Sequence, residues 1–98
     1  MPAYFLFDIL DITNEDKFEE YRSKVFATVE RYNGRYLVIG GQYEKLEGDW
    51  SPVFPVMIEF PDMDQARRWY NSAEYREIKD LRVEGTRSNG VILEGLPA

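Results

Sequence analysis

The sequence predicts a single α+β domain over residues 1–98, in which a four-stranded antiparallel sheet carries helices on one face. Four short, nearly continuous apolar segments are expected as strands, at residues 3–10, 35–39, 55–60 and 90–94. Only two helical stretches lie between them, which is too few to cover both faces of such a sheet. We therefore expect a second copy of the chain to bury the other face and form a homodimer.

Composition and charge narrow the classes of partner. The chain has 98 residues, of which 44% are hydrophobic, and its 18 acidic and 12 basic residues give a net charge of −6. This balance repels phosphate backbones and anionic lipids, so we expect no nucleic-acid partner and no membrane partner. No apolar run approaches the roughly 20 residues of a membrane span, and the first residues do not resemble a signal peptide. A cytoplasmic location is expected.

The chain contains no cysteine and no histidine. Thiol nucleophiles, imidazole metal sites and histidine-ligated haem are thereby excluded. The neighbouring acids Glu19 and Glu20, and Asp62 with Asp64, fit solvated helix faces and helix starts better than a carboxylate metal site. We expect no metal and no cofactor.

The first helix is predicted from its cap and its apolar stripe. Thr13 or Asn14 can cap its N-terminus, and Asn33 with Gly34 supplies a left-handed stop. Apolar residues recur three or four positions apart between these signals. They are Phe18, Tyr21, Val25, Val29 and Tyr32.

The second half of the chain repeats the pattern. The pair Gly40 and Gly41 predicts a bend, followed by a polar segment at residues 42–49 that we expect to form a hairpin. A second helix opens at Asp62, and Ser72 can cap a further short helix before a polar stretch at residues 84–89. The order is βαββαβ, which is the ferredoxin-like plait.

Alternation within the strands divides the sheet into two faces. The uniformly apolar face is assigned to the helices and comprises Phe5, Phe7, Ile9, Val56, Ile58, Phe60, Val91 and Leu93. The mixed face is assigned to the dimer partner and comprises Tyr4, Leu6, Asp8, Leu10, Met57, Glu59, Ile92 and Glu94. Carboxylates at such an interface need basic partners, for which Arg35, Arg82 and Arg87 are the candidates.

Four motifs resemble a small bacterial family of unknown function. They are GRYLVxGG at residues 34–41, LEGDW at 46–50, EFP at 59–61 and WYNSxEY at 69–75, with Arg82 after them. That family belongs to the dimeric α/β-barrel superfamily, and the resemblance covers almost the whole chain. It implies a homodimer whose two sheets face each other, with a pocket in each subunit between sheet and helices. It implies no established reaction, although other branches degrade haem, oxidise polyphenols without a cofactor or isomerise lactones.

The candidate ligand-binding residues are aromatic side chains and arginines, each with a structural alternative. Tyr21, Trp69, Tyr70 and Tyr75 can line a pocket for a flat aromatic ligand, or they can be ordinary core. Two arginines, Arg35 and Arg82, can clamp a carboxylate ligand, or they can pair with Asp8 or Glu59 and hold the dimer in register. Trp50 is either a lid or a dimer contact.

Three functions remain open. The first is a homodimer that binds a small apolar or aromatic molecule between sheet and helices. The second is a cofactor-independent oxygenase or isomerase acting on a small aromatic or lactone substrate. In that enzyme Asp8, Glu59 or Tyr75 would move a proton, and Arg82 would stabilise negative charge. The third is a purely structural or regulatory dimer, which a hydrated cavity of several hundred Å³ would contradict.

Overall fold

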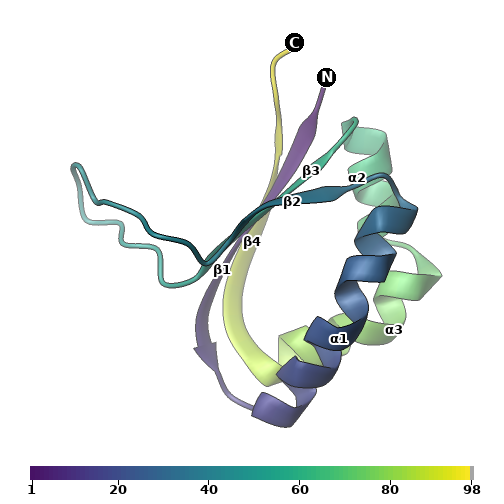
Figure 1. Cartoon of the computed structure of the whole chain (residues 1–98), viewed down its shortest axis with the longest axis horizontal. Coiled ribbons are helices and arrows are strands. Elements are labelled where there is room, and N and C mark those ends of the chain that lie inside the picture. The colour runs from purple at the N-terminus through teal and green to yellow at the C-terminus, as the bar shows by residue number, and fades with distance from the viewer. Residues whose placement is uncertain (98) are drawn as a thin grey trace.

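The computed structural model describes residues 1–97, which form one four-stranded sheet covered by helices on one face (Figure 1). The elements in chain order are β1 (Ala3–Ile12), α1 (Glu15–Arg31), β2 (Arg35–Ile39), β3 (Pro55–Phe60), α2 (Met63–Tyr70), α3 (Ala73–Gly85) and β4 (Thr86–Glu94). The strand order is β2-β3-β1-β4, and all neighbouring strands are antiparallel. The predicted ferredoxin-like α+β fold is confirmed.

The helix caps follow the sequence signals. Asn14, rather than Thr13, caps α1, and its side chain accepts a hydrogen bond of 3.1 Å from the backbone N–H of Lys17. Asp62 and Ser72 cap α2 and α3 in the same way. Asn33 has a φ of 64°, the left-handed conformation that ends α1. Each helix therefore begins at a residue whose short polar side chain can satisfy an otherwise free backbone N–H.

The end of α3 and the start of β4 differ from the prediction. The helix continues to Gly85, and β4 begins at Thr86 rather than at residue 90. The polar residues at 86–89 pair with the end of β1, where Thr86 lies opposite Ile12. Strand pairing is made by backbone groups, so a polar segment joins the sheet when the neighbouring strand extends past the core.

The predicted faces are correct for β1 and β3 and wrong for β4. Ile92 lies opposite Phe5 and therefore on the helix side, whereas Val91 opposes Leu6 and Leu93 opposes Tyr4 on the open side. Val91 is 51% exposed and Leu93 is 49% exposed in the single chain. Glu94 was also placed on the wrong face, since it opposes Ala3. Because Val91, Ile92 and Leu93 are all apolar, their alternation carries no signal for which face is buried.

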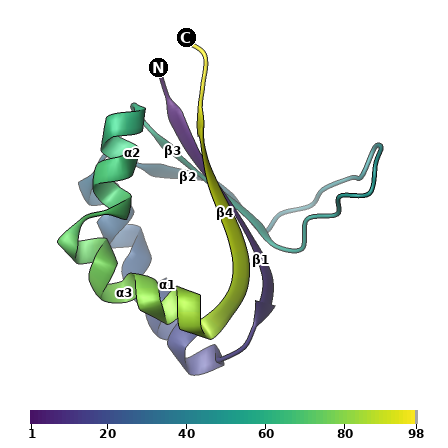
Figure 2. The same ribbon diagram turned by 180° about the vertical axis from the view of Figure 1, so that it is seen from behind.

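The segment between β2 and β3 extends away from the helices on the far side of the sheet (Figures 1 and 2). It leaves the sheet at Gly40, whose N–H donates to the carbonyl of Pro55 over 2.7 Å. The φ of Gly40 is 67°, a left-handed conformation that glycine adopts without steric strain. The expected hairpin is wrong, because residues 42–52 run out and back without forming strands. We call this segment, residues 41–54, the arm.

No helix within residues 1–97 combines the length and the apolar character needed to cross a membrane.

Gly90 on β4 leaves room for the ring of Phe7 on the neighbouring strand β1. A Cβ at this position would lie 2.7 Å from the ring of buried Phe7, so we expect Gly90→Ala to lower the free energy of unfolding by about 1–3 kcal/mol. Urea unfolding followed by circular dichroism measures the loss. Gly41→Ala is the matched control, since a Cβ there meets no atom within 4 Å. An equal urea midpoint for the two variants would contradict the close approach of Phe7 to β4.

Candidate functional site

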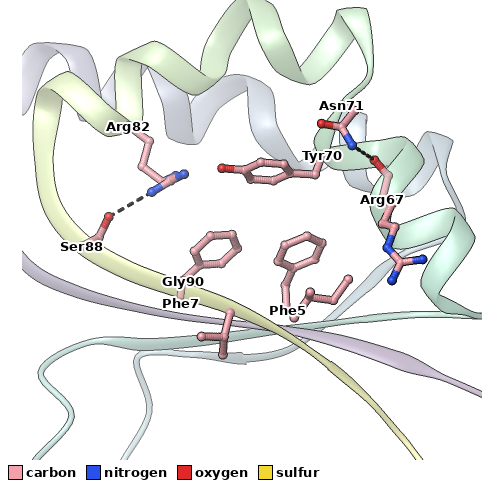
Figure 3. Close-up of a pocket in the computed structure, with 10 residues that line it drawn as sticks. Phe5, Phe7, Arg67, Tyr70, Asn71, Arg82, Ser88 and Gly90 are labelled. Carbon is pink, nitrogen blue, oxygen red and sulfur yellow. Dashed lines mark hydrogen bonds between the residues drawn. The ribbon is translucent and has the colours of Figure 1, made fainter.

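A cavity of about 670 Å³ lies between the sheet and the helices, on the side of β1 and β4 that faces α2 and α3 (Figure 3). Its volume is in the range of small-molecule sites. β1 contributes Phe5 and Phe7, which are two residues apart and therefore point to the same face. The helices contribute Tyr70 and Arg82.

Parallel aromatic rings form the apolar wall of this cavity. The rings of Phe5 and Phe7 have centroids 5.5 Å apart and planes within 2° of each other. Tyr70 stacks on Phe5 with a centroid distance of 5.6 Å. Ile92 on β4 extends the same surface. The wall offers a flat, apolar contact area suited to a planar molecule.

Arg82 is the polar group at one end of the cavity, and it is only 8% exposed. Its Nε donates to the Tyr75 hydroxyl over 3.3 Å, and its Nη1 donates to the Ser88 hydroxyl over 2.9 Å. The guanidinium carbon lies 4.9 Å from the centroid of the Phe7 ring. No carboxylate among residues 1–97 forms an ion pair with it.

A hydroxyl pair connects this arginine to the core. The hydroxyls of Tyr21 and Tyr75 are 3.0 Å apart, so α1 is linked to α3 at the residue that binds Arg82. Burial raises the pKa of Tyr21 well above its usual value, and neighbouring Tyr75 raises it further. For Arg82, burial favours the neutral form, but the hydroxyls of Tyr75, Tyr21 and Tyr70 outweigh it and raise the pKa. Arg82 therefore stays charged.

The predicted ligand-binding residues separate into three groups. Tyr70 and Arg82 line the cavity. Tyr21, Trp69 and Tyr75 are buried in the core, where Tyr75 and Trp69 are fully buried. The structure places Arg35 elsewhere, on β2, where its Nε lies 2.7 Å from a carboxylate oxygen of Glu59.

The candidate proton-transfer carboxylates do not line the cavity. Asp8 accepts hydrogen bonds from the backbone N–H groups of Val53, at 2.9 Å, and Phe54, at 2.8 Å, and so holds the base of the arm. Glu59 pairs with Arg35, as expected for a structural arginine. The other predicted basic partners, Arg82 and Arg87, form no ion pair within the described chain.

Sequence reasoning missed most residues of the cavity, among them Phe5, Phe7 and Ser88. Phe5 and Phe7 were assigned to the helix-facing core, and Ser88 was assigned to a polar connection before the last strand. Ser88 pairs with Ile9 of β1, and this register gives Ser88 the same orientation as the buried face. The signal in the sequence was the alternation of Ser88, Gly90 and Ile92, which is a strand pattern with small residues at its start.

Among residues 1–97, no group of three or more acidic side chains is arranged to hold a metal ion.

The order β2-β3-β1-β4 and the single helix layer define a protein of the ferredoxin-like class, and solved structures share this fold. A dimeric ferredoxin-like protein of unknown function from Jannaschia sp. CCS1 has a TM-score of 0.73 and 12% identity, covering 97% of this chain and 100% of that chain. The chain belongs to the family described as a domain of unknown function, DUF1330, which matches residues 2–96. The family-level resemblance seen in the sequence is thereby confirmed. No curated protein has a matching sequence.

Two further structures widen the comparison. A protein of unknown function from Rhodopseudomonas palustris has a TM-score of 0.75 and 17% identity, covering 99% of this chain and 84% of that chain. SnoaB, a cofactor-independent oxygenase from Streptomyces nogalater, has a TM-score of 0.67 and 15% identity, covering 99% of this chain and 95% of that chain. At these identities the similarities show a shared fold.

The raised pKa of Tyr21 predicts a loss of stability at alkaline pH. The unfolded chain ionises this phenol near pH 10 whereas the folded chain does not, so the free energy of unfolding should fall as the pH rises above about 10. Tyr21→Phe should make this fall smaller, while lowering stability at pH 7 by about 1 kcal/mol through the lost hydrogen bond to Tyr75. Urea unfolding at several pH values measures both effects.

The matched control is Tyr43→Phe, because Tyr43 is 50% exposed on the arm. It should leave the pH dependence unchanged. If Tyr21→Phe and wild type lost stability with the same pH slope, the buried neutral phenol would not be the cause.

Proposed function

We propose that the protein is a homodimer that binds a small aromatic molecule in the cavity between the sheet and helices α2 and α3. The observation that carries this proposal is the cavity itself, which has a volume of about 670 Å³ and a wall of parallel aromatic rings. Phe5 and Phe7 are only 7% and 5% exposed, so a planar ligand would remove from water chiefly the apolar surface of half-buried Tyr70 and Ile92. The polar groups of the cavity would orient it.

The open face of the sheet supports the homodimer. Apolar side chains remain on this face in the single chain, with Leu6 and Met57 half-buried and Val91 and Leu93 about half exposed. A contiguous apolar surface of this kind is typical of an interface. A second copy offers the same surface and would bury both. The dimeric state of the similarly folded Jannaschia protein is consistent with this arrangement.

The position of the arm favours its role as a dimer contact. Its residues Leu46 and Trp50 are 87% and 65% exposed, and the arm projects from the side of the sheet opposite the helices. No residue of the arm lines the cavity of Figure 3. Trp50 is therefore better placed to reach a second subunit than to cover a ligand.

A cofactor-independent oxygenase is the second candidate, supported by the fold shared with SnoaB. In such a reaction the substrate supplies the electrons to dioxygen, and a cation such as Arg82 would stabilise the substrate anion. No carboxylate among residues 1–97 lines the cavity for proton transfer, and Asp8 and Glu59 are bound elsewhere. Binding is thus better supported than catalysis, and a lactone isomerase has no group at the cavity to favour it.

A purely structural or regulatory dimer is the least supported function. A dimer that binds nothing has no need for a cavity of about 670 Å³ beside its core, because filling that space would add packing energy.

The dimer is tested by charge on the open face. Leu6→Lys and Met57→Lys should each give a monomer or an unfolded chain, because an interface lysine without a partner costs several kcal/mol. Sedimentation velocity measures the oligomeric state. Val83→Lys is the control, because Val83 is 55% exposed on α3 and far from this face. A stable dimer of either face variant would show that the interface lies elsewhere.

Ligand binding is tested with a neutral aromatic probe. We expect 2-naphthamide to shift the NMR signals of the cavity residues, and native mass spectrometry of gently purified protein should show a retained small molecule. Ile92→Trp should fill the cavity and abolish the shifts, because Ile92 faces the ligand space. Val83→Trp, on the outer surface of α3, should leave them intact. Equal binding by both variants would place the probe outside the cavity.

A further inference from the structure

We propose that the cavity recognises a carboxylate on its ligand through the guanidinium of Arg82, so that the ligand is an aromatic acid. This inference rests on the proposed ligand-binding function and narrows its substrate class. It is carried by a buried cation that has no counter-charge in the described chain and that lies at one end of a ligand-sized cavity.

The environment of Arg82 is unusual for a structural arginine. Buried arginines are generally paired with a carboxylate, because removing an unpaired charge from water costs several kcal/mol. This chain carries 18 acidic residues, and yet the protein partners of Arg82 are the neutral hydroxyls of Tyr75 and Ser88. The interaction with the Phe7 ring compensates only part of the lost hydration. A ligand carboxylate would complete the set of partners.

The unused donors of Arg82 are available to a ligand. Nε is bound to Tyr75 and one hydrogen of Nη1 to Ser88, while Nη2 has no protein acceptor within residues 1–97. Because the guanidinium is planar, its Nη groups present a pair of donors to a carboxylate. The hydrogen bonds to Tyr75 and Ser88 hold that plane in place before a ligand arrives, which reduces the entropy lost on binding.

Tyr70 supplies a second donor at the same end. Its ring lies in the cavity wall, and its hydroxyl points toward Arg82 (Figure 3). This hydroxyl has no hydrogen-bond partner in the part of the chain that the structure describes. The Nζ of Lys79 lies 4.9 Å from the centroid of the Tyr70 ring and adds positive potential. Two donor groups, the Arg82 guanidinium and the Tyr70 hydroxyl, therefore lie at one end of the cavity.

The other arginine of the cavity is a weaker anion site. Arg67 lines the opposite end, but its side chain is exposed and therefore hydrated. A charge interaction in water of high dielectric contributes little, whereas the same interaction at buried Arg82 is screened less. The apolar wall of Phe5 and Phe7 runs between the two ends. A ligand whose planar aromatic ring lies on this wall and whose carboxylate lies at Arg82 would use both the apolar wall and the buried guanidinium.

The test compares 2-naphthoate with 2-naphthamide, which has the same shape and no charge. For the wild-type dimer at pH 7 we expect 2-naphthoate to bind at least about tenfold more tightly, measured by NMR titration. Arg82→Gln should remove this preference and bring the two dissociation constants within about twofold of each other, whatever the absolute affinity of the variant for 2-naphthamide. Circular dichroism and the retained naphthamide binding report that the variant is folded.

Two matched charge deletions control for a general electrostatic effect. Arg68→Gln removes the same charge from α2 at an exposed residue that is paired with Asp64 and does not line the cavity. Arg67→Gln removes it at the exposed end of the cavity. Both should retain the preference for 2-naphthoate. If Arg67→Gln lost it and Arg82→Gln kept it, the inference would be overturned.

The remaining outcomes separate the two proposals. Equal affinity of wild type for both probes would overturn the carboxylate inference and leave aromatic ligand binding standing. Binding of neither probe would overturn both. If Arg82→Gln fails to fold, Tyr70→Phe decides, because it removes a carboxylate donor from a partly exposed side chain. It should weaken 2-naphthoate by about threefold to tenfold more than 2-naphthamide, and no difference would count against the inference.

Discussion

The burial of one guanidinium is the constraint on which the arrangement of helices and β4 depends. Arg82 is charged and only 8% exposed, so Nε and Nη1 need acceptors at fixed positions, whereas Nη2 has none within residues 1–97. Tyr75 accepts from within α3 and is joined by its hydroxyl to Tyr21 on α1, while Ser88 accepts from β4. The Phe7 ring lies against the guanidinium from β1. One side chain thus connects two helices and two strands, and any shift of these elements would leave a buried charge unsatisfied.

The distribution of charge limits how the proposed anionic ligand would be recognised. Two strand carboxylates are used elsewhere, Asp8 for the base of the arm and Glu59 for Arg35. The cavity is lined by Arg67 and Arg82 and by no carboxylate of residues 1–97, so it is positive in a chain of net charge −6. At physiological salt the field of the whole chain is screened beyond about 8 Å. An anionic ligand is therefore not attracted from a distance. Its selection depends on the buried donors that it meets inside the cavity, where the effective dielectric is low.

The sequence predicted the helix starts well, because a single capping residue marks each of them. Asn14, Asp62 and Ser72 begin the helices because a short polar side chain can accept from the first turn. Strand β4 was placed on the wrong face, because Val91 and Ile92 are equally apolar and only the pairing with β1 decides between them. A register irregularity between Ile9 and Asp11 affects that same pairing. A bulge of this kind depends on the neighbouring strand and cannot be read from local periodicity.

In the candidate site, too, single residues could be predicted from the sequence, whereas features that depend on strand pairing could not. Tyr70 and Arg82 were among the sequence candidates, because an aromatic ring can stack on a ligand and an arginine can clamp a carboxylate. The cavity, however, also depends on Ser88 and on the start of β4. The two faces of the sheet nevertheless remain physically connected through β1, where Phe7 faces the cavity and adjacent Leu6 faces the open side. Because interiors are close-packed, a ligand that displaced Phe7 would also disturb the packing of adjacent Leu6 in the proposed dimer.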